Sequence, residues 1–185
     1  LYLDTQDSRG LISSQHNSNV FAARSKVMSE ADLVILVGRK LDYQLAYGSP
    51  AIFRNATFMR ISDNPYELVD NRRGEPEIYA EPKLVFETIN RRELNLNFDK
   101  NWIMQIQNFH KKKLENLKNT KEVYIGDDNK IHPNYIFNCI SNLIQNNYVG
   151  IADGGDILSF ARVGLNSKYY LDSGVFGCLG IGVPY

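Results

Sequence analysis

Glycine is concentrated near the end of this chain in a way that limits the folds it can adopt. An apolar run from Tyr148 to Ala152 is followed at once by Asp153-Gly154-Gly155, and residues 156–163 have the pattern of a helix that Gly164 would end. This order predicts a buried strand that passes through a tight turn into a helix. The free N–H groups of the first helical turn, together with the helix dipole, favour an anion at that point.

A second strand and a second glycine-rich turn follow directly. Residues 168–171 are predicted to form a strand. Four glycines then lie within nine residues, at Gly174, Gly177, Gly180 and Gly182. Neighbouring parallel strands open at the same edge of a sheet, so the two turns are predicted to form one ligand site.

Each turn also has a simpler interpretation. Gly154-Gly155 can be an ordinary strand-to-helix turn with Asp156 as the N-cap, and the later glycines can serve chain reversal and helix packing. A carboxylate at Asp156 would repel a diphosphate unless it turned away or a cation intervened. The later spacing, G-x-x-G-x-x-G-x-G, differs from the dinucleotide fingerprint G-x-G-x-x-G, which argues against an NAD-dependent dehydrogenase.

The rest of the chain alternates between strand and helix patterns, which predicts an α/β fold with parallel sheets. Strands are expected at residues 1–3, 31–38, 57–61 and 77–79, and helices at 20–29 (capped by Asn19), 82–92, 102–117 and 133–146, with a turn at 126–129. The run A-D-L-V-I-L-V-G at residues 31–38 predicts a strand that is buried on both faces. We expect a Rossmann-like central domain at residues 1–92, a linker with a helix at 93–130, and the start of a second α/β domain at 131–185.

Composition excludes several classes of partner. The formal net charge is zero, which gives no electrostatic reason to expect nucleic acid or an anionic membrane as a partner. Neither a membrane span nor a signal peptide is visible. Cys139 and Cys178 match no disulfide or metal pattern, which is typical of a cytoplasmic protein.

The remaining candidate side chains have ordinary interpretations. His16, His110 and His132 lack a partner pattern, so we expect each to be solvated or to cap a turn. The lysines at 111–113 are expected on a solvated helix face. The chain begins without Met and stops at Pro184-Tyr185, so we expect it to be a piece of a longer polypeptide.

Several motifs together resemble one enzyme family. They are S-R-G-L-I-S-S-Q-H, A-D-L-V-I-L-V-G-R-K-L-D-Y-Q-L-A-Y-G, I-H-P, A-D-G-G-D and D-S-G-V-F-G-C-L-G-I-G-V-P. In this order they resemble the thiamine-diphosphate-dependent enzymes of the acetolactate synthase superfamily. The similarity is greatest to the branch of acetolactate synthase, 2-hydroxyacyl-CoA lyase and oxalyl-CoA decarboxylase.

The resemblance implies a role for each glycine turn. The first turn would contact the cofactor diphosphate through backbone groups, and the second would lie against the aminopyrimidine. The Gly177 carbonyl would accept from the exocyclic amine, the Leu179 N–H would bond a ring nitrogen, and the Leu179 side chain would bend the cofactor so that it deprotonates itself. The implied cofactor-binding residues are Gly154, Gly155, Asp156, Ile157, Gly177, Cys178 and Leu179.

The resemblance also implies groups that are absent from this chain. The catalytic residue is unknown here, because the activating glutamate of the family lies in an N-terminal domain of a neighbouring subunit. The metal-binding G-D-G…N segment is also absent, so no metal ligand is identified. We therefore expect this chain to be inactive alone, and the whole protein to be a homodimer or homotetramer that binds thiamine diphosphate and Mg.

Two questions stay open at this point. The substrate is expected to be a small 2-oxo acid or an acyl-CoA, and the central domain can hold FAD or another adenine nucleotide near Arg39, Asp42 and Asp63. The alternative function is a non-catalytic nucleotide- or cofactor-binding homologue that keeps the fold without the chemistry.

Overall fold

The computed structural model describes residues 1–5, 8–92, 94, 97–119, 129–144, 147–165, 167, 169–174 and 176–184. The chain divides into two compact units: Ser25–Lys100, and Leu1–Arg24 together with Asn101–Tyr185. Among the described residues, no helix combines the length and the apolar character needed to span a bilayer.

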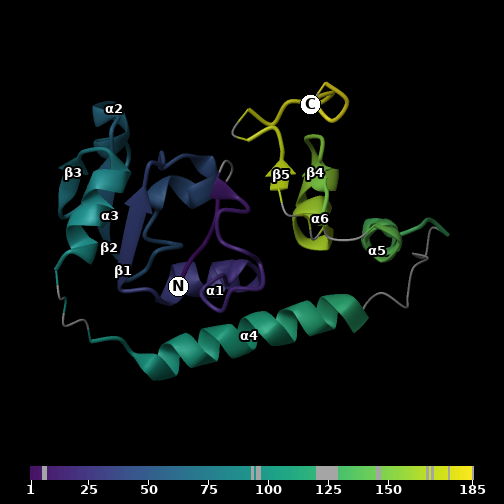
Figure 1. The fold of residues 1–185 in the computed structure, drawn as a ribbon, viewed down its shortest axis with the longest axis horizontal. Helices are drawn as coiled ribbons and strands as arrows, with labels where there is room; N and C mark the ends of the chain where they lie inside the picture. The colour runs from purple at the N-terminus through teal and green to yellow at the C-terminus, as the bar shows by residue number, and fades with distance from the viewer. Residues whose placement is uncertain are drawn as a thin grey trace. The chain divides into compact units, whose positions relative to one another are not determined.

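The unit Ser25–Lys100 is built on a parallel sheet of three strands (Figure 1). The strands are β1 (Leu33–Val37), β2 (Thr57–Ser62) and β3 (Glu77–Tyr79), in the order β1-β2-β3. Leu33 pairs with Thr57, and Arg60 pairs with Glu77. These three strands lie where the sequence predicts them, and the predicted α/β class with parallel sheets is confirmed.

The burial of β1 differs from the prediction. Its side chains alternate between exposed and half-buried, with Leu33 at 49% and Ile35 at 50% relative exposure. Successive side chains of a strand point to opposite faces of the sheet, and those on one face of β1 are exposed. Within the described sheet β1 is also an edge strand that pairs only with β2. The expectation of a strand buried on both faces is therefore wrong for this structure.

Short helices lie between the strands of this sheet and after the last of them. They are η3 (Tyr43–Gly48) between β1 and β2, α2 (Pro65–Leu68) between β2 and β3, and α3 (Pro82–Asn90) after β3. The Asn64 side chain accepts from the N–H of Tyr66 and caps α2, while the fixed φ of Pro65 suits the first helical position. The buried apolar residues of this unit, among those described, are Val27, Met28, Ala31, Leu41, Leu45, Phe53, Ala56, Phe58, Ile61 and Leu68.

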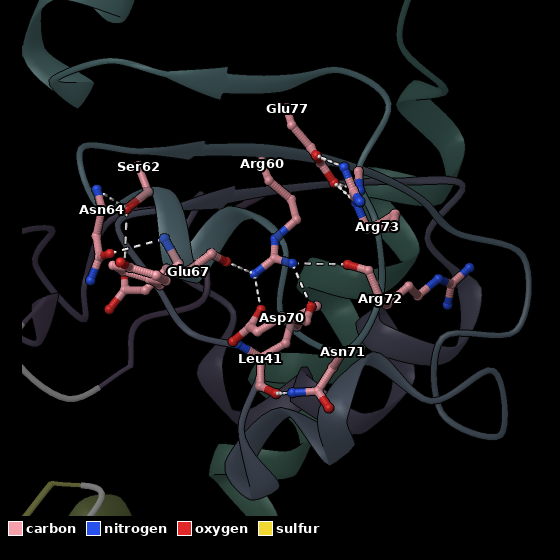
Figure 2. Close-up of polar contacts among 12 residues, drawn as sticks. Leu41, Arg60, Ser62, Asn64, Glu67, Asp70, Asn71, Arg72, Arg73 and Glu77 are labelled. Carbon is pink, nitrogen blue, oxygen red and sulfur yellow. Dashed lines mark hydrogen bonds and ion pairs between the residues drawn. The ribbon is translucent and has the colours of Figure 1, made fainter.

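A buried arginine organises the segment between α2 and β3 (Figure 2). The Arg60 side chain is 1% exposed and forms an ion pair with Asp70. Its guanidinium also donates to the backbone carbonyls of Glu67, Asp70 and Arg72. The second carboxylate oxygen of Asp70 accepts from the N–H of Leu41 at 3.1 Å. Arg60 therefore holds this segment in place, and through Asp70 it also holds Leu41 in the loop that follows β1.

The second unit contains a smaller parallel sheet. It is formed by β4 (Val149–Ile151) and β5 (Tyr169–Leu171), with α5 (Pro133–Leu143) before β4 and α6 (Asp156–Gly164) between the strands. Helices α5 and α6 pack against each other, and Gly164 permits this because a Cβ there would lie 2.6 Å from the Cβ of Phe137. The buried cluster of this part is Phe137, Ala152, Leu158 and Ala161.

The N-terminal segment differs from the prediction. A 3-10 turn, η2 (Phe21–Ala23), precedes helix α1 (Arg24–Glu30), and the Asn19 side chain does not cap either of them. Instead the Asn19 amide donates to the Ile12 carbonyl at 3.2 Å, so it closes the loop that leads to η2. The expected strand at residues 1–3 is reduced to a single bridge between Tyr2 and Asn19. Most of the turn expected at 126–129 lies outside the described residues.

Helix α4 (Lys100–Asn119) packs on this N-terminal segment through one buried histidine. His110 is 7% exposed, its Nδ1 accepts the N–H of Ala22 at 3.2 Å, and its ring meets the ring of Phe21 edge to face. Of the two roles expected for His110, solvated or capping, the solvated role is wrong, because the ring is buried and its Nδ1 accepts an N–H group of the η2 turn. Lys111, Lys112 and Lys113 are exposed as predicted. Burial lowers the pKa of His110, and the nearby charge of Lys111 lowers it further.

We predict that Arg60→Ala destabilises the protein by about 3 kcal/mol, because it removes the ion pair to Asp70 and leaves the carbonyls of Glu67, Asp70 and Arg72 without the donor that Arg60 supplies. Urea denaturation of the purified variant measures this loss. Arg73→Ala is the matched control, since it also removes an arginine–carboxylate pair, but its side chain is 70% exposed. A loss for Arg60→Ala no greater than that of Arg73→Ala would contradict the role given to Arg60.

We predict that the contact between α4 and η2 weakens in acid. The pKa of folded His110 is below its unfolded value, so its contribution is complete above the unfolded value of about 6.5 and is lost as the pH falls through the folded pKa. The expected loss is about 1 kcal/mol, the net contribution of one hydrogen bond. Unfolding free energies between pH 5 and 8 measure it. The variant His110→Asn, whose amide oxygen does not titrate, should lose this part of the pH dependence.

Candidate functional site

Two loops leave the carboxyl ends of β4 and β5 and come together. We call residues 152–155 the β4 loop and residues 172–184 the β5 loop. Because β4 and β5 are parallel neighbours, both loops start at the same edge of the sheet. The sequence predicts this meeting, and the described contacts between the loops confirm it.

The loops approach through their backbones at Gly154. A Cβ at this position would lie 2.8 Å from the carbonyl oxygen of Gly177 and closer still to that of Cys178. Any other residue would therefore force two stretches of main chain apart. The close approach explains why glycine stands at 154, whereas a simple strand-to-helix turn does not require it.

One carboxylate holds the two loops together. Asp153 accepts three backbone N–H groups: Gly154 at 2.8 Å, Gly180 at 2.9 Å and Ile181 at 3.2 Å. These bonds favour the charged form and lower the pKa of Asp153 below its ordinary value. Asp153 was not among the site residues predicted from the sequence. The feature that could have identified it is its position in the sequence, directly between a predicted strand and a pair of glycines.

The β4 loop ends at the start of helix α6. Gly155 is the N-cap, with φ of +79°, so the alternative interpretation, in which Asp156 caps the helix, is wrong. Asp156 occupies the first helical position, where its carboxylate lies at the positive end of the dipole. The first N–H groups of α6 have no intrahelical acceptor by helix geometry and can serve an anion.

Exposed side chains lie at this helix start and on the β5 loop beside it. Leu179 is 75% exposed, and its Cδ2 lies 3.5 Å from where a Cβ at Gly155 would stand. Ile157 is 40% exposed, and Cys178 is an exposed free thiol. The structure therefore brings together all the sequence-predicted residues of the two loops, with Leu179 beside the N-terminus of α6.

A second group of candidates lies in the unit Ser25–Lys100. Arg39 and Asp63 follow the carboxyl ends of β1 and β2. Arg39 Nη2 lies 3.0 and 2.9 Å from the two Asp42 oxygens and 3.1 Å from Gln44 Oε1, while Asp42 also accepts the N–H of Gln44. These groups stabilise the turn after β1, and Asp63 is exposed.

The remaining histidines have local structural roles. His16 Nδ1 accepts the N–H of Ser18 at 3.1 Å, and His132 Nδ1 accepts the N–H of Asn134 at 3.2 Å as the N-cap of α5. The predicted capping role is confirmed for both. Within the part of the chain that the structure describes, no three His, Cys, Asp or Glu residues lie close enough to hold a metal ion.

The chain is similar in sequence to enzymes of several types. The chain is 26% identical over 189 residues to the acetolactate synthase large subunit of Mycobacterium tuberculosis. It is 24% identical over 194 residues to 2-hydroxyacyl-CoA lyase 1 of Mus musculus, and 23% identical over 191 residues to oxalyl-CoA decarboxylase of Escherichia coli. No family model matches the chain.

These matches cover nearly all of this chain but only part of each relative. They cover 96%, 100% and 100% of this chain, but only 32%, 32% and 33% of the three relatives. The chain therefore spans about a third of the length of the curated relatives it matches. The three enzyme types are those to which the sequence motifs pointed, so the predicted resemblance is confirmed.

We predict that Gly154→Ala separates the two loops, because the new methyl group cannot fit between the backbones. The amides of Gly180 and Ile181 should then exchange with solvent at least about tenfold faster, the factor that corresponds to a loss of 1.4 kcal/mol. Hydrogen exchange read by mass spectrometry measures this. Gly182→Ala is the matched control: its Cβ would lie 3.6 Å from that of Asp153, an ordinary contact. Equal exchange in the two variants would contradict the close approach at Gly154.

Proposed function

This chain is similar along nearly its whole length to thiamine-diphosphate-dependent enzymes of the acetolactate synthase superfamily, and we propose that the full-length protein binds thiamine diphosphate with Mg and makes or breaks a carbon–carbon bond. The observation that carries this proposal is the convergence of the β4 and β5 loops at Gly154. In the proposed division, residues 1–92 belong to the central domain and residues 131–185 open the diphosphate-binding domain.

The start of α6, directly after the β4 loop, suits a diphosphate. The N–H groups of Asp156 and Ile157 lie in the first turn of α6, where backbone donors and the helix dipole attract an anion. The carboxylate of Asp156 would repel a bare diphosphate at this position. A magnesium ion carried by the diphosphate offsets that repulsion, because Mg²⁺ is commonly bound through phosphate oxygens together with a few carboxylates and water.

The β5 loop suits the aminopyrimidine. The Gly177 carbonyl lies beside Gly154 and has a second lone pair with which it can accept from an amine. The exposed Leu179 side chain can support an aromatic ring by apolar contact, and its N–H can donate to a ring nitrogen. When bound, thiamine diphosphate supplies an electron sink next to the carbonyl carbon of the substrate. The part of this chain is to orient the cofactor through these groups.

The finer assignment follows from the names of the relatives. They act as an acetolactate synthase, a 2-hydroxyacyl-CoA lyase and an oxalyl-CoA decarboxylase. We therefore propose a small 2-oxo acid or an acyl-CoA as the substrate, and FAD or another adenine nucleotide as a second ligand of the central domain. We further propose a cytoplasmic homodimer or homotetramer whose activating glutamate comes from outside this chain, so that the chain alone is inactive.

Calorimetry with thiamine diphosphate and Mg tests the proposal on the full-length protein. We expect Mg-dependent binding, and Leu179→Asp should weaken it by at least about tenfold, since it replaces the apolar contact to the face of an aromatic ring by a charge that also repels the diphosphate. Leu179→Met is the matched control, because it keeps an apolar side chain of similar volume and should bind nearly as the parent does.

Two outcomes would count against the proposal. The enzyme assignment fails if the intact protein does not bind thiamine diphosphate, and adenine nucleotides then become the first ligands to test for a non-catalytic homologue. If the protein binds but Leu179→Asp binds equally well, the cofactor does not contact the β5 loop at this residue.

A further inference from the structure

Asp172 follows β5 directly and begins the β5 loop. Its side chain is 3% exposed, and its Oδ1 accepts the N–H of Gly174 at 2.8 Å. Gly174 has φ of +56°, a conformation that favours glycine, so this bond fixes the first turn of the loop. The position of the β5 loop thus depends on where the Asp172 carboxylate is held.

Two arginines from different parts of the chain hold that carboxylate. Arg162, in the last turn of α6, donates to Asp172 Oδ2 from Nε at 3.1 Å and from Nη2 at 2.9 Å. Arg9, in the N-terminal segment, lies 3.4 Å from the same oxygen. A single buried carboxylate therefore connects α6, the β5 loop and a segment that is more than 150 positions away in the sequence.

Arg9 is itself largely buried. Its side chain is 18% exposed, its guanidinium lies 5.4 Å from the centre of the Tyr170 ring, and its Nε is buried without a hydrogen-bond partner among the described residues. Burial lowers the pKa of Arg9, and the charge of Arg162 lowers it further. Asp172, Asp4 and the ring of Tyr170 compensate this buried charge, and Asp172 contributes the most, so Arg9 and Asp172 should be strongly coupled.

We infer that Arg9 is a positioning residue for the β5 loop, and that the N-terminal segment controls cofactor affinity through the Arg9–Asp172–Arg162 cluster. This inference rests on the proposed function, since the β5 loop is assigned there to the aminopyrimidine. Arg9 touches no proposed ligand. It acts by keeping the Asp172 carboxylate in place, and the carboxylate in turn holds the N–H of Gly174.

The test uses the full-length protein and has two readouts. Hydrogen exchange without cofactor reports the loop itself, and calorimetry with thiamine diphosphate and Mg reports the consequence. In Arg9→Gln we expect the amide of Gly174 to exchange about tenfold faster and the dissociation constant to rise by a similar factor. The strands β1 and β2 should exchange as in the parent protein, which excludes general unfolding.

Three further variants test whether Arg9 acts through its charge and through Asp172. Asp172→Asn keeps an acceptor for Gly174 without the charge, so adding Arg9→Gln to it should change little. Arg9→Lys keeps the charge but not the planar group over Tyr170, and should give an intermediate effect even if Arg9→Gln does not fold. Arg73→Gln removes an exposed arginine–carboxylate pair in the other unit and should leave the loop unchanged.

The possible failures are distinguishable. If the parent protein binds thiamine diphosphate while Arg9→Gln and Arg9→Lys match it in exchange and affinity, the inference is wrong and the proposed function stands. If the parent protein does not bind, the proposed function falls and the assignment of Arg9 to cofactor positioning falls with it. Equal effects of Arg9→Gln in the parent and Asp172→Asn backgrounds would also overturn the inference, because Arg9 would then act through another group.

Discussion

The acceptance of three backbone N–H groups by Asp153 is the interaction on which the candidate site depends. Two loops that leave parallel strands carry many N–H groups that no strand partner can satisfy, and a glycine-rich loop has few side chains with which to hold its shape. A carboxylate at the strand end solves both problems, since it accepts several N–H groups at once and its charge strengthens each bond. The glycine at 154 then lets the two backbones meet.

Asp172 performs the same task at the neighbouring strand end. It also accepts a loop N–H, but it lies deeper and its charge is balanced by arginines from α6 and from the N-terminal segment. The two aspartates thus differ in kind. Asp153 joins the two loops to each other, whereas Asp172 joins one of them to the surrounding structure. A rigid pair of loops is what an enzyme needs when backbone groups, not side chains, recognise the cofactor.

In the unit Ser25–Lys100 a buried positive charge, the Arg60 guanidinium, holds a connecting segment in place. There Arg60 donates to carbonyls of the segment between α2 and β3 (Figure 2). Asp70, which is paired with Arg60, accepts the N–H of Leu41. In both units the strands themselves are short, so buried charged groups supply much of the order of the connecting segments. This arrangement is costly to break, because removing one partner leaves a buried charge or several buried polar groups unpaired.

The order of strands and helices, the parallel class and the meeting of the two glycine loops could be predicted from the amino-acid sequence, since apolar periodicity and turn residues are local signals. The sequence also carried the family resemblance. It could not determine that β1 is half exposed, because burial depends on which elements lie beside a strand. The burial of His110 and the joining of Arg9 to Asp172 were likewise decided by the tertiary structure. Charged and polar side chains choose their partners by spatial proximity, and residues so far apart in the chain leave no pattern that reveals the pairing.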